Sequence, residues 1–256
     1  SLAEIIQRNS DAEGLPFLIF NAPSQTFDMS KSSLTYPDIT LVGGATWVYP
    51  GSEHVVFNGT AGNDGVVSGS GDDTIRGNDG DDTATGGPGD DSIIGGLGDD
   101  TLSDPSGIDV VMAGDGSDFI NTGGPGLDVY LAGAGSDFTM GGGYGTEQLG
   151  GPGNDFMYGG TSGDALSGDE DSDWLEGGVG DDSLSGDLAA IFGVDIASPG
   201  DDVMIGDSGS NLLNGDGGVD IMVGGTQGTN SVLGGLGFDF STYYNPRSMA
   251  AHVADL

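Results

Sequence analysis

The sequence predicts an all-β fold, a parallel β-solenoid, and three observations lead to that prediction. Glycine accounts for 53 of the 256 residues, far more than an ordinary compact core uses. From Gly59 to Thr242 the chain can be cut every nine residues, with a few interruptions. Each unit carries an aspartate followed two residues later by a large apolar residue. Units this short bury their apolar residue only by stacking on their neighbours, as in a solenoid.

The nine-residue unit reads G-G-x-G-x-D-x-U-x, where U is large and apolar. Glycine at positions 1, 2 and 4 permits positive φ angles and leaves carbonyl oxygens uncovered, so six residues can form a tight turn with oxygens pointing inward. Positions 7 to 9 then form a short strand whose middle side chain faces inward. Fourteen units end at Ser185 and five more follow residues 186–196, which makes nineteen. The interruption is either a loop leaving one continuous solenoid or a seam between two blocks.

The inward position 8 is well suited to a core in sixteen units, with Ala84, Thr139 and Ser241 as weaker members. The sixteen residues are Val66, Ile75, Ile93, Leu102, Val111, Ile120, Tyr130, Leu149, Met157, Leu166, Leu175, Leu184, Met204, Leu213, Met222 and Val232.

Position 6 supplies the candidate metal ligands, because it is Asp in sixteen units and Glu147, Asn211 or Asn230 in the other three. The sixteen are Asp64, Asp73, Asp82, Asp91, Asp100, Asp109, Asp118, Asp128, Asp137, Asp155, Asp164, Asp173, Asp182, Asp202, Asp220 and Asp239.

Stacking these aspartates requires a cation. If one turn of the coil comprises two units, Asp64 lies over Asp82 at a spacing of about 4.8 Å. Two carboxylates about 5 Å apart repel by roughly 3 kcal/mol at an effective dielectric near 20. A dozen such contacts exceed the stability of a domain. Multiple Ca²⁺ ions, each taking six to eight hard oxygen ligands, reverse the sign of this interaction. Without metal, we expect the disordered acidic tract that the composition also fits.

Composition divides the chain into five segments. Residues 1–50 are expected to form an N-terminal helix, a strand and a linker; the helix is indicated by Leu2, Ile5 and Ile6 at helical spacing and the strand by "LPFLIF". Residues 51–185 form a first block of the solenoid, 186–196 an insertion, 197–242 a second block and 243–256 a truncated C-terminal cap. Because the chain does not begin with Met, we expect it to be a piece of a longer protein.

Charge and missing motifs exclude several functions. A net charge of −37 excludes nucleic acid and anionic membrane surfaces as partners, and no apolar run is long enough to span a bilayer. There is no Cys and no H-E-x-x-H or G-x-S-x-G motif, so we expect no enzyme activity in this chain. The two histidines are expected at the surface or in a cap. The acids at position 5, such as Asp72 and Asp90, are expected on a solvated face, and Trp174 and Tyr130 in core or edge packing.

The units resemble the nonapeptide of the RTX family, the hemolysin-type calcium-binding repeats, over roughly residues 59–242. The resemblance implies a right-handed parallel β-roll with Ca²⁺ between turns, each ion shared by turn carbonyls and the position-6 aspartates of two loops. It also implies export by the type I secretion machinery and folding outside the cell. By this mapping the sites from Asp64 to Asp118 are the strongest, and those near Glu147, Asn211 and Asn230 are weak or empty.

The first ten residues are similar to the closing helix of animal-type haem peroxidases, on the matches Ser1, Leu2, Ala3, Ile5, Ile6 and Asn9. An arbitrary amphipathic helix that caps the solenoid explains them equally well. If the resemblance holds, haem is a cofactor of an upstream domain and not of this chain.

The leading hypothesis is a secreted, calcium-binding module that folds on binding and stabilises or anchors a neighbouring domain. Extracellular modules bind Ca²⁺ at about 10⁻⁴ to 10⁻³ M. The alternatives are the accessory tail of a secreted peroxidase and a calcium-rigidified adhesion or surface-layer module. Its partners would be an upstream domain or a cell surface.

Overall fold

The computed structural model describes residues 54–187 and 200–242 with their side chains, Val48 and Ser52, and the backbone of five strands in residues 6–48. The chain divides into two compact units, Ser1–Pro125 and Gly126–Leu256. In each, every regular element among the described residues is a β-strand. No described segment is a helix of the length and apolarity needed to cross a membrane.

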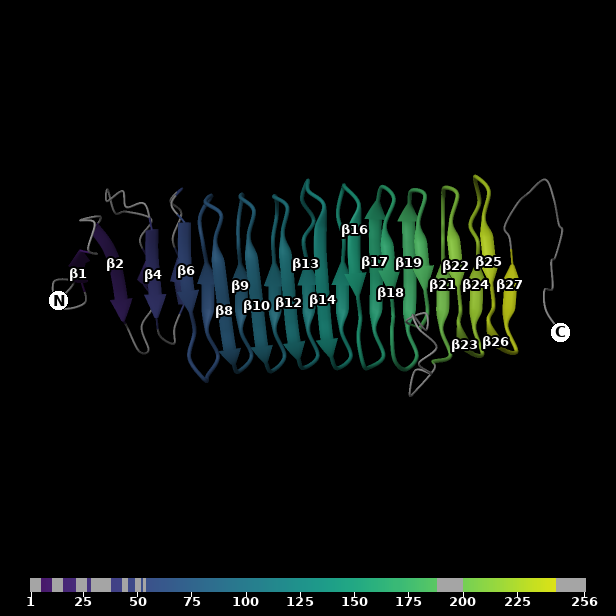
Figure 1. Ribbon diagram of the computed structural model, residues 1–256, viewed down its shortest axis with the longest axis horizontal. Helices are drawn as coiled ribbons and strands as arrows, with labels where there is room; N and C mark the ends of the chain where they lie inside the picture. The colour runs from purple at the N-terminus through teal and green to yellow at the C-terminus, as the bar shows by residue number, and fades with distance from the viewer. Residues whose placement is uncertain are drawn as a thin grey trace. The chain divides into compact units, whose positions relative to one another are not determined.

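The first unit consists of two sheets whose strands, from β2 onward, run parallel and alternate between the sheets along the chain (Figure 1). One sheet contains β1 (Ile6–Ser10), β2 (Pro16–Asn21), β4 (Asp38–Val42), β6 (His54–Asn58), β8 (Thr74–Asp79), β10 (Ser92–Leu97) and β12 (Val110–Asp115). The other contains β3 (Phe27–Asp28), β5 (Thr46–Val48), β7 (Gly65–Val67), β9 (Thr83–Thr85), β11 (Thr101–Ser103) and β13 (Phe119–Asn121).

The second unit repeats this arrangement. One sheet contains β14 (Asp128–Ala134), β16 (Thr146–Leu149), β18 (Ala165–Ser167), β20 (Ser183–Ser185), β22 (Leu212–Asn214) and β25 (Ser231–Leu233). The other contains β15 (Phe138–Met140), β17 (Phe156–Thr161), β19 (Trp174–Val179), β21 (Val203–Ile205), β24 (Ile221–Val223) and β27 (Phe240–Thr242). A short pair, β23 (Gly217–Gly218) and β26 (Leu236–Gly237), joins two of the turns.

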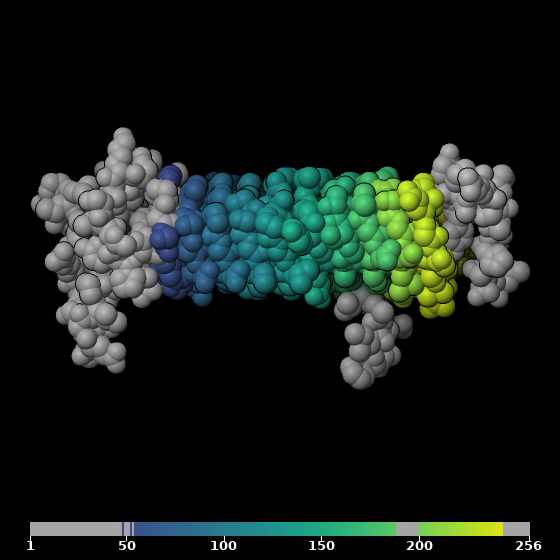
Figure 2. Space-filling view, turned by 90° about the horizontal axis from the view of Figure 1, so that it is seen from above, coloured from purple at the N-terminus to yellow at the C-terminus, as the bar shows by residue number. Residues whose placement is uncertain are grey.

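In the regular part of the coil, strands in one sheet pair in parallel at an offset of eighteen residues, as Ile75 with Ile93 and Ile93 with Val111 show. One turn of the coil therefore comprises two nonapeptides. From β6 onward each sheet has four strands in the first unit and six in the second, so the solenoid has about ten turns. The predicted number of nineteen nonapeptide units was counted from the sequence, and the fold does not support it. In Figure 2 the colour changes in successive bands along each unit, because neighbours in sequence stay neighbours in space.

The core is a column of position-8 side chains in each sheet. In the first unit Ile75, Ile93 and Leu102 are fully buried. The second unit has a continuous buried cluster of Met157, Leu166, Leu175, Leu184, Met204, Leu213 and Met222, against which Val232 packs. Alternation along short strands thus places the residues as the period predicts.

The prediction was wrong in the unit at residues 141–149. In β16 the buried residues are Thr146 and Gln148, whereas Glu147 is exposed and Leu149 is half-buried. Thr146 pairs with Asp128 and Gln148 with Tyr130, so Thr146 occupies position 6 and Gln148 position 8. The prediction shifted this unit by one residue, because it assigned the acid Glu147 to position 6 and the apolar Leu149 to position 8. In a strand, such a slip exchanges the buried face for the exposed one.

Glycine serves two different needs in the turn. Gly96, at position 2, has φ +131°, a conformation that glycine adopts without strain. Gly77, at position 1, does not have a positive φ; it is required because a Cβ there would lie 2.0 Å from Asp82 Oδ2. The expectation that position 1 needs glycine for its φ angle is therefore replaced by a need for space.

The N-terminal helix is also a wrong prediction where the structure describes it. Residues Ile6–Ser10 form strand β1, which pairs antiparallel with β2, from Ile6 with Phe20 to Ser10 with Pro16. The edge of a sheet has unpaired backbone groups that can pair with another segment of the chain. Here this pairing with β2 outweighs the weak helical pattern of the first residues. The stretch expected to be linker contains β3, β4 and β5, and both sheets therefore begin before Gly59. Residues 1–5 and 243–256 lie outside the described residues.

The insertion interrupts the sequence period but not the strand register. β19 pairs with β21 and β20 with β22, so Trp174 lies beside Val203 and Ser183 beside Leu212. Here the offset along the chain is 29 residues instead of 18. The strands before Asp187 and after Gly200 thus keep the same pairing, and residues 188–199 lie outside the described residues.

Candidate metal-binding sites

The sixteen predicted aspartates all stand at the start of a short strand, two residues before the inward side chain. Fifteen are at most 5% exposed, and Asp239, in the last described turn, is partly exposed. In Asp82, for example, the turn through Gly80 leads the chain inward, and β9 then carries Ala84 into the core. The fold therefore places the carboxylates in rows inside each unit, at the edge of the apolar column.

In thirteen of the sixteen aspartates, Oδ1 accepts a backbone amide of the preceding turn. The amide of Asp64 donates to Asp82 Oδ1 at 2.6 Å, and that of Asp82 to Asp100 Oδ1 at 2.7 Å. The same bond recurs in the second unit, including the turn across the insertion, where Asp173 N donates to Asp202 Oδ1 at 2.9 Å. Each of these aspartates thus holds the preceding turn through its Oδ1.

In the regular turns the other oxygen, Oδ2, points at the glycine at position 1; for Asp202, which follows the insertion, that glycine is Gly186. Among the described residues Oδ2 has no hydrogen-bond partner in Asp82, Asp91, Asp100, Asp155, Asp164, Asp173, Asp182, Asp202 and Asp220. A Cβ built on Gly77 would lie 2.0 Å from Asp82 Oδ2 and 2.7 Å from the carbonyl oxygen of Gly95 in the next turn. The equivalent pair of oxygens lies near Gly168, where a Cβ would be 2.1 Å from Asp173 Oδ2 and 2.7 Å from Gly186 O. Two acceptors therefore converge on a space without a donor.

Burial makes these carboxylates hard to ionise without a cation. It is the largest cause raising the pKa of Asp82 and Asp100 to about 6 and that of Asp173 and Asp220 to about 8. The amide that donates to Oδ1 lowers each pKa, and the charges of neighbouring aspartates raise it further. In these groups burial and the neighbouring negative charges together outweigh the hydrogen bond from the backbone amide.

The protein supplies almost no positive charge of its own. The chain has 4 Lys and Arg residues, and Arg76 is the one whose side chain the structure describes; it is exposed on the outer face. A buried anion without a partner is unstable, so a bound cation is the physical requirement of this arrangement. Carboxylate and carbonyl oxygens are the ligands that Ca²⁺ prefers, and the residues present therefore fit calcium. The position-6 aspartates and the carbonyl groups of the glycine-rich turns would hold the ion.

In four turns the polar side chain at position 6 has hydrogen-bond partners that the regular turns lack. Asp64 Oδ2 accepts the amide of Thr60 at 2.5 Å, and Asp128 Oδ2 accepts the hydroxyl of Tyr130 at 3.3 Å. In the third turn, Nδ2 of Asn211 donates to Gly206 O at 2.7 Å. These turns lack the unpaired oxygen of the nine regular ones, and Asp64 therefore differs from its neighbours in a run that the resemblance treats as uniform.

In the fourth turn, residues 141–149, polar side chains bond to one another instead. Thr139 Oγ1 donates to Gln148 Oε1 at 2.5 Å, and Gln148 Nε2 donates to Thr146 Oγ1 at 2.9 Å and to Tyr158 O at 3.0 Å. Gln148 and Thr139 are fully buried. The interior of this turn is neutral and satisfied.

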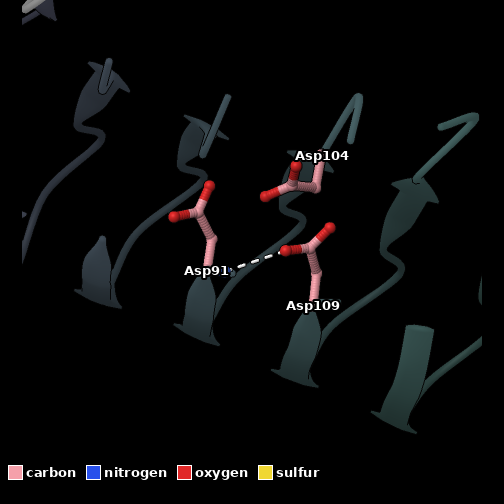
Figure 3. A group of neighbouring side chains, drawn as sticks. All are labelled: Asp91, Asp104 and Asp109. Carbon is pink, nitrogen blue, oxygen red and sulfur yellow. Dashed lines mark hydrogen bonds between the residues drawn. The ribbon is translucent and has the colours of Figure 1, made fainter. Parts of the chain in front are cut away.

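Sequence reasoning missed Asp104, which lies at position 1 of its unit. Its carboxylate is fully buried and comes within 4.8 Å of those of Asp91 and Asp109 (Figure 3). Burial, followed by the charges of Asp109 and Asp91, raises the pKa of Asp104 to about 10. The sequence does mark Asp104 as unusual, because position 1 of every other unit among the nineteen is Gly, Ala or Ser.

The position-5 acids are exposed, as expected, and they also stabilise the coil. Asp90 N donates to Asp72 Oδ1 and Asp99 N to Asp81 Oδ1, both at 3.1 Å. These side chains accept an amide from the following turn, opposite in direction to the buried row. Tyr130 is fully buried, whereas Trp174 is on the outer face and stacks on Phe156 with ring centroids 6.1 Å apart.

Comparison with known proteins agrees with this geometry. The family model of the RTX calcium-binding nonapeptide repeat matches four times, at residues 67–102, 106–139, 149–184 and 196–227. No curated protein matches the chain. Nothing in the comparisons supports the peroxidase resemblance of the first ten residues or a role for haem. Because the four matches cover more than half of the 256 residues and coincide with the rows of buried aspartates, the chain belongs to the family of RTX calcium-binding nonapeptide repeat proteins.

Proposed function

We propose that this chain is a module that folds when it binds several calcium ions and does no chemistry other than coordination. The observation that carries the proposal is the unpaired Oδ2 of nine buried aspartates, seven of which converge with a carbonyl oxygen of the next turn on the space above a glycine. In the folded chain without metal these groups are desolvated and repel one another. Because binding requires a site that only the folded state has, the free energy of calcium binding becomes free energy of folding.

Chelation tests this proposal directly. In millimolar calcium we expect a β-type far-ultraviolet circular dichroism spectrum, which a slight excess of EDTA at pH 7.5 abolishes. Added calcium restores it, whereas the same concentration of magnesium does not, because Mg²⁺ requires stricter octahedral geometry. A spectrum that chelation leaves unchanged would falsify the proposal.

The proposed setting is outside the cell. Extracellular calcium modules bind at about 10⁻⁴ to 10⁻³ M, so the chain would stay unfolded at cytosolic calcium and fold after export. The net charge of −37 supports this order of events, since self-repulsion keeps the metal-free chain extended and soluble. Secretion through a type I system and the stabilising or anchoring of a neighbouring domain belong to the same proposal.

A second candidate function, an adhesive surface, is favoured by the outer face of the second unit. There the rings of Phe138 and Phe156 stack at a centroid distance of 4.9 Å, and Trp174 extends the row. Farther along the same sheet, Ile221 and Phe240 are 47% and 66% exposed. An apolar outer row of this kind suits contact with another protein surface. Binding assays in saturating calcium distinguish this role from folding alone.

A further inference from the structure

Asp104 departs from the repeat at the place where the other turns have a small residue. It occupies position 1 of the unit at residues 104–112, in the turn before β12. The coil holds this side chain completely away from solvent, at 0% exposure. Its Oδ1 accepts only a long bond of 3.3 Å from the amide of Ser106.

The second oxygen of Asp104 has no hydrogen-bond partner among the described residues and points into the space above Gly86. A Cβ on Gly86 would lie 2.1 Å from Asp104 Oδ2 and 2.4 Å from Asp91 Oδ2. Figure 3 shows the Asp104 carboxylate, from the turn, facing that of Asp91. These two oxygens therefore meet in one small, dry space.

In the regular turns, that space receives one carboxylate and one neutral carbonyl. Above Gly95, for example, the neighbours are Asp100 Oδ2 at 2.1 Å and Ala113 O at 2.7 Å. At Gly86, Asp104 replaces the carbonyl of the next turn with a second carboxylate. Asp109, whose Oδ1 accepts the amide of Asp91 at 2.8 Å, is the third carboxylate of the group. This site therefore concentrates more negative charge than a regular turn.

We propose that Asp91, Asp104 and Asp109 form a distinct high-affinity site that fills with Ca²⁺ before the regular sites of the coil. The inference rests on the proposed calcium-dependent folding and adds an order of filling to it. Ligand charge is one of the main determinants of calcium affinity, and buried oxygens already held by the backbone lose little freedom on binding. The competing explanation is a proton shared between Asp91 and Asp104, with no special role for the ion.

The test is calcium titration of the full metal-stripped chain by isothermal calorimetry against a competing chelator, at pH 7.5. In the unmodified chain we expect about one ion to bind roughly tenfold or more tightly than the rest. Asp104→Gly, which restores the glycine of the repeat, should remove this tight phase and leave the weaker one. Asp104→Asn, which keeps the side-chain shape, should do the same. The matched control is Asp90→Asn, an exposed acid of the neighbouring turn, which should keep the tight phase.

Hydrogen exchange at graded calcium locates the site independently. Amides of residues 86–112 should gain protection at the lowest calcium concentration, and in Asp104→Gly they should need about tenfold more. Retention of the tight phase in both Asp104 variants overturns the inference and favours the shared proton. A chain that takes up no calcium at all refutes the proposed folding function, an outcome distinct from failure at Asp104 alone.

Discussion

The turns at Asp82 and Asn211 are built alike and differ in one atom. In both, Oδ1 accepts the amide of the preceding turn, from Asp64 at 2.6 Å and from Asp182 at 2.9 Å. The second atom of Asp82 is an oxygen without a partner, whereas that of Asn211 is an amide nitrogen that donates to Gly206 O at 2.7 Å. The side-chain amide of Asn211 thus pairs directly with a turn carbonyl, whereas the carboxylate of Asp82 needs a cation to do so.

This contrast teaches where calcium is required and where it is not. The backbone of the coil tolerates two solutions, an ion between oxygens or a hydrogen bond between an amide and a carbonyl. The unit containing Thr146 and Gln148 adds a third, a closed network of neutral side chains. Dependence on calcium therefore resides in the regular turns, and the experiments below aim to move it or remove it.

The largest expected effect is on the metal-free chain as the pH changes. The folded-state pKa values of Asp82 and Asp173 are raised to about 6 and about 8, above the value near 3.9 of an unfolded chain. The folded state therefore binds more protons, and its stability is greatest near pH 4 and falls as the pH rises toward 8. At about 1.4 kcal/mol per pKa unit, a few such groups outweigh the usual stability of a domain.

In EDTA we thus expect β-type circular dichroism near pH 4.5 and its loss at pH 8. In saturating calcium the dependence reverses, since protons compete with the ion for the same oxygens. A metal-free chain equally structured at both pH values would show that the buried charges are compensated in another way.

The next effect comes from filling the space in which an ion is expected. A Cβ from Gly77→Ala lies 2.0 Å from Asp82 Oδ2 and 2.7 Å from Gly95 O, so the turn must shift. We expect the free energy of unfolding in calcium to fall by about 3 kcal/mol, measured by urea denaturation. Gly62→Ala is the matched control, because nothing lies within 4 Å of its Cβ, and it should change stability by less than about 0.5 kcal/mol. Similar losses in both variants contradict the special role of position 1.

The smallest effect is expected from exchanging the two kinds of turn. Asp82→Asn should supply an amide donor to Gly77 O, as Asn211 does to Gly206 O, and reduce the calcium bound per chain by about one ion. Asn211→Asp should do the reverse. Because a net hydrogen bond contributes only about 1 kcal/mol, the calcium midpoint of folding should shift by less than tenfold in either case. Equilibrium dialysis measures the stoichiometry, and an unchanged count in both variants contradicts the comparison.

The predictions from sequence succeeded where one period served both backbone and side chain. The inward residues from Ile75 to Met222 and the burial of Asp73 or Asp173 follow from the spacing of two between ligand and core residue. They failed at Glu147 and Leu149, because the period counted from Gly141 puts polar residues, Thr146 and Gln148, at positions 6 and 8. They failed again at Ile6–Ser10, where pairing with a distant strand decides the conformation.

What the sequence by itself determined is the period, and with it the turn, the short strand and the row of aspartates. Only the tertiary structure decided whether the second polar atom of each side chain, Oδ2 of an aspartate or Nδ2 of an asparagine, has a hydrogen-bond partner. The amide that donates to Asp82 Oδ1 and the space above Gly86 that Asp104 Oδ2 enters both lie eighteen residues away in a neighbouring turn. A pattern nine residues long does not contain those contacts. Asn211 donates to Gly206 O within its own unit, but the direction of that carbonyl depends on the coil. Coiling brings them together, and it leaves some oxygens with a donor and others in need of an ion.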